Sequence, residues 1–134
     1  MSVTGKDFIE FAGKCIAHDD EIGFRNAIGR AYYGVYHETL EKLEKCPDRA
    51  THQDVRNYLI NDAWLTGYEP FDKMKLISVG TMLKHLHTRR KWADYELERT
   101  LNKADAEAIL IMANRAMDTL HQMHEEVYPS KPAA

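Results

Sequence analysis

Apolar side chains recur at intervals of three and four residues along most of this 134-residue chain, as at Leu76, Val79, Leu83 and Leu86. That interval matches the turn of an α-helix, which places such residues on one face. Only four prolines occur, and few stretches alternate polar and apolar residues as a half-buried strand would. The sequence therefore predicts an all-α fold.

Three short motifs mark where helices begin. Thr4, Thr51 and Asn102 each stand three residues before an aspartate, a capping-box-like pattern that satisfies the free amides of a first turn. With breaks at 46–48 and 66–70, they predict helices at about 4–18, 21–45, 51–62, 70–98 and 103–127. We expect one domain over 1–134, an antiparallel four-to-five-helix bundle with its core at about 4–127 and a frayed tail at 128–134.

Charge and cysteine content restrict the classes of function. The net charge is −3 and the pI about 6.1, which argues against binding nucleic acid or anionic membrane by bulk charge. Cys15 and Cys46 lack metal-site spacing and predict reduced thiols. No apolar run is long enough to span a bilayer, and early charged residues argue against a signal peptide. We expect a cytoplasmic protein that needs no cofactor and contacts no membrane.

The second predicted helix carries a polar stripe nearly opposite its apolar one. The apolar stripe runs through Ile28, Ala31, Tyr32, Val35, Tyr36 and Leu43. Arg30 and His37 lie on the polar side, with Gly34 between them, where a second backbone or a ligand can approach closely. An imidazole that titrates near neutral pH beside a permanent guanidinium suits phosphodiester chemistry. A solvated helix face is the alternative interpretation.

A basic cluster lies on the fourth predicted helix, at Lys84, Arg89, Arg90 and Lys91. Arg90 falls where the apolar stripe predicts a buried side chain, so it needs a partner, and Asp94 one turn later can form an intrahelical pair with it. A metal site is not expected. The best candidate group, at 121, 124 and 125 (His, His, Glu), has helical spacing but no further ligand.

Three segments occur in the order seen in small prokaryotic HEPN-domain proteins: RNAIGRAYYGVYH at 25–37, THQDV at 51–55 and RRKWADYEL at 89–97. The chain resembles the subgroup with an Arg-Ala-Tyr-Tyr run ending in histidine and a later Arg-x-x-Ala-Asp-Tyr element, over about residues 5–127. The resemblance implies a HEPN-type all-α bundle that forms a homodimer and acts on RNA. It also implies a metal-independent endoribonuclease of a toxin–antitoxin or phage-defence system, beside a nucleotidyltransferase-like antitoxin.

The first hypothesis is an RNA-cleaving HEPN dimer in which Arg30 and His37 have the arginine–histidine spacing of the family but lie on the earlier helix. His37 is expected to move a proton and Arg30 and Arg90 to stabilise phosphate charge, which leaves 2′,3′-cyclic phosphate ends. The residues expected to bind RNA are Lys84, Arg89, Lys91, Tyr33, Trp92 and Tyr95.

Other functions stay open. Nuclease members of the family carry a histidine soon after the late-helix arginine, where this chain has Asp94 to Leu97. A non-catalytic HEPN module that binds RNA, a nucleotide or a protein is therefore the alternative, with Arg90 and Asp94 as a structural pair. A purely structural helical dimer is a third hypothesis.

Overall fold

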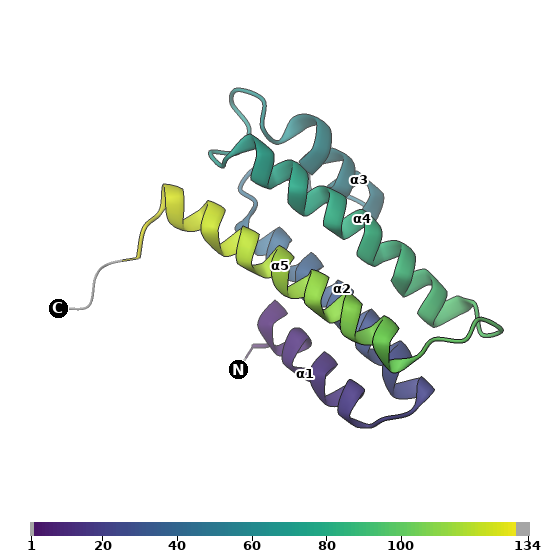
Figure 1. The fold of residues 1–134 in the computed structure, drawn as a ribbon. Helices are drawn as coiled ribbons and strands as arrows, with labels where there is room; N and C mark the ends of the chain where they lie inside the picture. Colours follow the sequence, from purple (N-terminus) through teal and green to yellow (C-terminus); the bar gives the residue numbers. More distant parts are fainter. Residues whose placement is uncertain (1, 131–134) are drawn as a thin grey trace.

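The computed structural model describes residues 2–130, which form an all-helical bundle with no β-strand in that range (Figure 1). The α-helices are α1 (Gly5–Ala17), α2 (Glu21–Lys42), α3 (His52–Asn57), α4 (Lys73–Tyr95) and α5 (Lys103–Val127). A single π-helical turn, η1 (Tyr58–Asp62), continues α3. The predicted all-α bundle is thus confirmed. None of these helices combines the length and the apolar character needed to cross a membrane.

α2 is the central element of the bundle. It packs against α1, α4 and α5, while α3 and η1 pack on α4. Figure 1 shows α3 and α4 on one side of the bundle and α1 on the other. The side chains of the predicted stripe on α2, including Ile28, Tyr32 and Val35, are almost fully buried. Tyr32 of this stripe is also hydrogen-bonded to His52, so the start of α3 contacts α2 through side chains.

Gly34 lets α1 approach α2 closely. A Cβ atom at this position would lie 2.8 Å from the carbonyl oxygen of Gly5 and 2.7 Å from Cδ1 of Ile9. Both separations are shorter than real Cβ contacts, so only glycine fits without a shift of α1. The predicted close approach at Gly34 is confirmed, and the approaching backbone is that of the chain's own first helix.

The helix starts agree closely with the predictions, and all three capping boxes are present. The ends differ. The helix predicted over 21–45 ends at Lys42, because buried Glu69 accepts hydrogen bonds from the backbone amides of Glu44 and Lys45 at 2.7 Å each. Glu69 also accepts one from the hydroxyl of Tyr58 at 2.6 Å. One carboxylate thus ties the segment after α2 to the turn after α3.

The helix predicted over 70–98 is shorter as well, at Lys73–Tyr95. Arg25 of α2, only 5% exposed, donates hydrogen bonds to the carbonyl oxygens of Ala93 at 2.9 Å, Trp92 at 3.2 Å and Arg99. These bonds satisfy the free carbonyls at the end of α4 and hold the chain in a turn. Leu97, which the predicted helix over 70–98 would have included, consequently lies in this turn and is 73% exposed.

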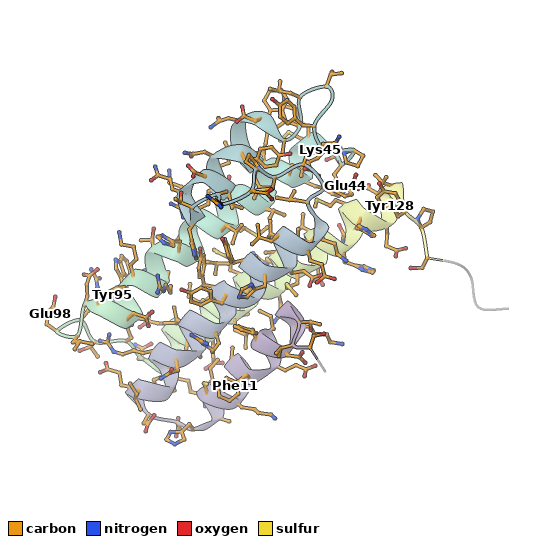
Figure 2. All side chains as sticks on the ribbon, turned by 180° about the vertical axis from the view of Figure 1, so that it is seen from behind. Phe11, Glu44, Lys45, Tyr95, Glu98 and Tyr128 are labelled. Atoms are coloured by element: carbon orange, nitrogen blue, oxygen red, sulfur yellow. The ribbon has the colours of Figure 1, made fainter. Side chains whose placement is uncertain are left out.

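The end of the described chain is tied to the bundle. The Tyr128 hydroxyl donates to Glu44 at 2.7 Å, and the Ser130 amide donates to Glu125 at 3.0 Å. Figure 2 shows Tyr128 beside Glu44 and Lys45, at the end of the molecule opposite Tyr95. Within the predicted frayed tail, residues 128–130 are therefore anchored, and residues 131–134 lie outside the described range.

Candidate functional site

A basic groove lies between the start of α3 and the second half of α4. Its volume is about 610 Å³. The residues that line it are Thr51, His52, Gln53, Arg56, Lys84, His87, Thr88, Arg90, Lys91, Trp92 and Glu96. Four of these carry a permanent positive charge and one carries a carboxylate, so the groove favours an anion. We call this set of residues the basic groove.

Local sequence explains how the groove forms. The capping box of Thr51 starts α3, so that His52 stands at its first position and Arg56 one turn later. On α4, Lys84, His87 and Lys91 follow one another at three and four residues and share one face. The packing of α3 on α4 brings these two sets of side chains to opposite walls.

His52 is held by two tyrosines of α2. Its Nδ1 is hydrogen-bonded to the Tyr32 hydroxyl. Its ring stacks on Tyr36 with centroids 4.2 Å apart and the planes inclined by 2°. Burial lowers the pKa of His52, with further lowering by Arg90, Arg56 and His37. The imidazole is thus fixed in orientation and mainly uncharged at neutral pH.

His87 faces His52 from the other wall. The two ring centroids are 5.9 Å apart, and the edge of the Tyr32 ring lies against His87 at 5.4 Å. Burial lowers the pKa of His87 to about 4, and Arg56, His52, Arg90 and Lys91 add to this effect. The groove therefore holds two neutral imidazoles among four fixed cations at neutral pH.

Two guanidinium groups have a buried nitrogen with no hydrogen-bond partner among residues 2–130. They are Nη1 of Arg56, in the basic groove, and Nε of Arg30 on α2. Buried donors of this kind are normally satisfied. At Arg56, a phosphate or carboxylate oxygen in the groove would supply the missing acceptor.

The three predicted catalytic residues surround one aromatic ring. The guanidinium carbons of Arg30 and Arg90 lie 5.4 and 5.2 Å from the centroid of the Tyr33 ring. The His37 ring stacks on Tyr33 at 6.1 Å. His37 is exposed and lines a different hollow, near the start of α1 at Phe8, whereas Arg90 lines the basic groove. The three residues are neighbours, but no single cavity contains all of them.

The predicted pair of Arg90 and Asp94 is present, with Nε of Arg90 2.9 Å from a carboxylate oxygen of Asp94. The Arg90 guanidinium also lies 5.6 Å from the ring of Tyr95. Tyr95 is 69% exposed and is thereby accessible to a base.

The residues predicted to bind RNA fall into two groups. Lys84 and Lys91 line the basic groove, whereas Arg89 lines a second cavity of about 420 Å³. Trp92 separates the two, and the guanidinium groups of Arg89 and Arg99 lie over its ring at 4.1 and 3.8 Å. Trp92 is thus already stacked on cations of its own chain.

Four residues with important roles in the structure were not predicted from the sequence: His52, Arg56 and His87 at the centre of the groove, and Arg25 at the end of α4. His52 had a usable signal, because it directly follows a capping threonine. His87 stands three residues before Arg90 on the same side of its helix. The proximity of His87 to His52 and Arg56 had no signal in the sequence, because it arises from the packing of α3 on α4.

No cluster of three or more histidine, cysteine, aspartate or glutamate side chains suited to a metal ion is found in residues 2–130. Cys15 and Cys46 are free thiols, as expected. Comparisons with family models, curated proteins and solved structures gave no match to this chain.

Proposed function

We propose that this chain is a HEPN-type module that binds RNA and holds the phosphate backbone in the basic groove. The observation that carries the proposal is the charge of the groove, whose lining has four cations, Arg56, Lys84, Arg90 and Lys91, and one carboxylate. Asp94 pairs with Arg90 beside it, and the groove keeps an excess of positive charge. Cations that contact phosphates supply most of the sequence-independent affinity for nucleic acids. The unpartnered nitrogen of Arg56 supports an oxyanion as ligand.

The resemblance to HEPN proteins extends the proposal to assembly and context. We propose a homodimer that works in a toxin–antitoxin or phage-defence system, with a nucleotidyltransferase-like antitoxin as a partner. The molar mass of the purified chain by light scattering tests the dimer, because one chain has a mass of 15.5 kDa.

RNA binding is tested by fluorescence anisotropy with a labelled single-stranded RNA at several salt concentrations. Each groove lysine that contacts a phosphate contributes about 0.7 to the slope of log affinity against log salt. The double variant Lys84→Gln/Lys91→Gln should therefore lose affinity and about 1.4 of slope. The control Lys6→Gln/Lys103→Gln removes the same charge from exposed sites outside the groove. Equal effects of the two double variants, or no binding by the wild type, would refute the proposal.

RNA cleavage is a second candidate function. The groove holds imidazoles and guanidiniums together, which is the combination that proton transfer and phosphate stabilisation require. A non-catalytic binding module is the alternative. Incubation of the purified protein with mixed RNA in EDTA separates the two, because cleavage would leave 2′,3′-cyclic phosphate ends and binding alone would leave the RNA intact.

A further inference from the structure

We propose that His52 and His87 form the proton-transfer pair of a site in the basic groove that cleaves single-stranded RNA by attack of a ribose 2′-hydroxyl. This inference rests on the proposed RNA binding. It assigns the chemistry to two residues other than Arg30 and His37 of α2 and Arg90 of α4.

The separation of the two rings suits one phosphodiester between them. The centroids are 5.9 Å apart, and both side chains line the groove. A general acid or base works over about 3 Å from nitrogen to oxygen. One imidazole can therefore reach the attacking oxygen while the other reaches the leaving oxygen of the same phosphate.

The surroundings of His52 fix which nitrogen it presents. Nδ1 is engaged by Tyr32, so Nε2 is the nitrogen left for a substrate. A hydroxyl both donates and accepts hydrogen bonds, so Tyr32 can serve the neutral and the protonated imidazole in turn. The parallel stack on Tyr36 keeps the ring in plane during that change. Tyr32 and Tyr36 are thus positioning residues for His52.

Two guanidiniums flank the pair. Arg56 offers its buried, unpartnered Nη1, and Arg90 is held in place by its ion pair with Asp94. Both guanidiniums line the same groove as the two imidazoles, and both lower the pKa values of His52 and His87. Positive charge at this point stabilises the extra negative charge that a phosphorane-like transition state carries.

The proposed reaction is a transesterification. The 2′ oxygen bonds to phosphorus while the bond from phosphorus to the 5′ oxygen breaks. His87 takes the proton of the 2′-hydroxyl, and the imidazolium form of His52 gives its Nε2 proton to the departing 5′ oxygen. The products are a 2′,3′-cyclic phosphate and a 5′-hydroxyl. Proton exchange with water then restores both histidines.

The electrostatics of the groove decide which histidine is the base. His87 faces Arg56 of α3, Arg90 and Lys91 of α4 and the His52 ring, and its pKa of about 4 keeps it deprotonated over most of the acidic range. The pKa of His52 is lowered from 6.5. This side chain faces Tyr32, Tyr36 and His37 of α2 as well as Arg56 and Arg90. The base must be neutral and the acid protonated, so kcat/KM should be greatest between pH 4 and 6.5.

The test uses the full chain with a fluorescent single-stranded RNA in EDTA, and with DNA of the same sequence. We expect cleavage of the RNA only, with cyclic phosphate ends. His52→Gln and His87→Gln should each lower kcat about 100-fold or more and change the dissociation constant for RNA only a few-fold. His85→Gln is the matched control, because His85 is exposed on the same helix and lines the other cavity. Circular dichroism checks that each variant is folded.

The possible outcomes distinguish a failure of the proposed cleavage by His52 and His87 from a failure of the proposed RNA binding. RNA that is bound but not cut between pH 4 and 8 would overturn the inference and leave RNA binding intact. Cleavage that survives in both glutamine variants but is lost in His37→Gln would overturn it as well. Absence of RNA binding would overturn both proposals. The pH profile of the wild type needs no variant, and a kcat/KM that rises steadily from pH 5 to 8 would contradict the assignment.

Discussion

Replacement of Arg25 by methionine should strongly destabilise the fold, although Arg25 lies outside the basic groove. The guanidinium is 5% exposed and donates to carbonyl oxygens at the end of α4, at 2.9 Å to Ala93 and 3.2 Å to Trp92. A hydrogen bond from a charged donor contributes about 1.5–3 kcal/mol, and carbonyls left unpaired when buried add to the loss. These two bonds alone predict a loss of about 3–6 kcal/mol.

That loss is a large part of the stability of a domain, which is about 5–15 kcal/mol. Urea unfolding followed by circular dichroism measures it, and the melting temperature should fall by roughly 10 °C or more. Arg115→Met is the matched control on the exposed face of α5 and should change stability by no more than about 0.5 kcal/mol. A loss below about 1 kcal/mol for Arg25→Met would refute the view that this side chain holds the end of α4.

Three further changes test the fold and the groove. Gly34→Ala should lower the free energy of unfolding by about 1–3 kcal/mol, because the new Cβ meets the α1 backbone. Gly13→Ala is the control and should be neutral or stabilising, because a Cβ there meets nothing within 4 Å. Equal unfolding midpoints for the two variants would contradict this packing. Because the folded-state pKa of His87 is lowered to about 4, the unfolded chain binds the extra proton and stability should fall as pH drops from 7 to 4. After allowance for solvent screening, His87→Gln should reduce this loss of stability between pH 7 and pH 4 by about 1–2 kcal/mol. The same slope of unfolding free energy against pH in the variant and the wild type would contradict this role of His87. Glu69→Gln should lose about 1–3 kcal/mol and speed proteolysis in the segment after α2, and wild-type protease resistance would show that the carboxylate is not needed there.

The helices could be predicted from the sequence because their signals are local. Each capping box lies within one turn, and the apolar spacing of α2 and α4 indicates the buried face directly. The ends of α2 and α4 could not be predicted, because distant residues determine them. Glu69 binds amides 24 and 25 residues away, and Arg25 binds carbonyls about 70 residues away.

The candidate site could be predicted only in part for the same reason. Arg90, Lys84 and Lys91 were visible as a basic cluster on one helix, and all three line the groove. His52 and His87 are 35 positions apart in the sequence and meet only when α3 packs on α4. The catalytic role of His37 and Arg30 stays a prediction. Both side chains contact the ring of Tyr33, outside the lining of the basic groove.

The position of Trp92 between two cavities makes it an optical sensor. The chain has only two tryptophans, so Trp64→Phe leaves a single indole, one that borders the basic groove and stacks under Arg89 and Arg99. Arg89 and Arg99 line the second cavity, so an anion that enters it and draws those guanidiniums away should change the emission of the indole. Trp92 also lines the basic groove, so a ligand there meets the same ring, and one indole reports the occupation of either cavity.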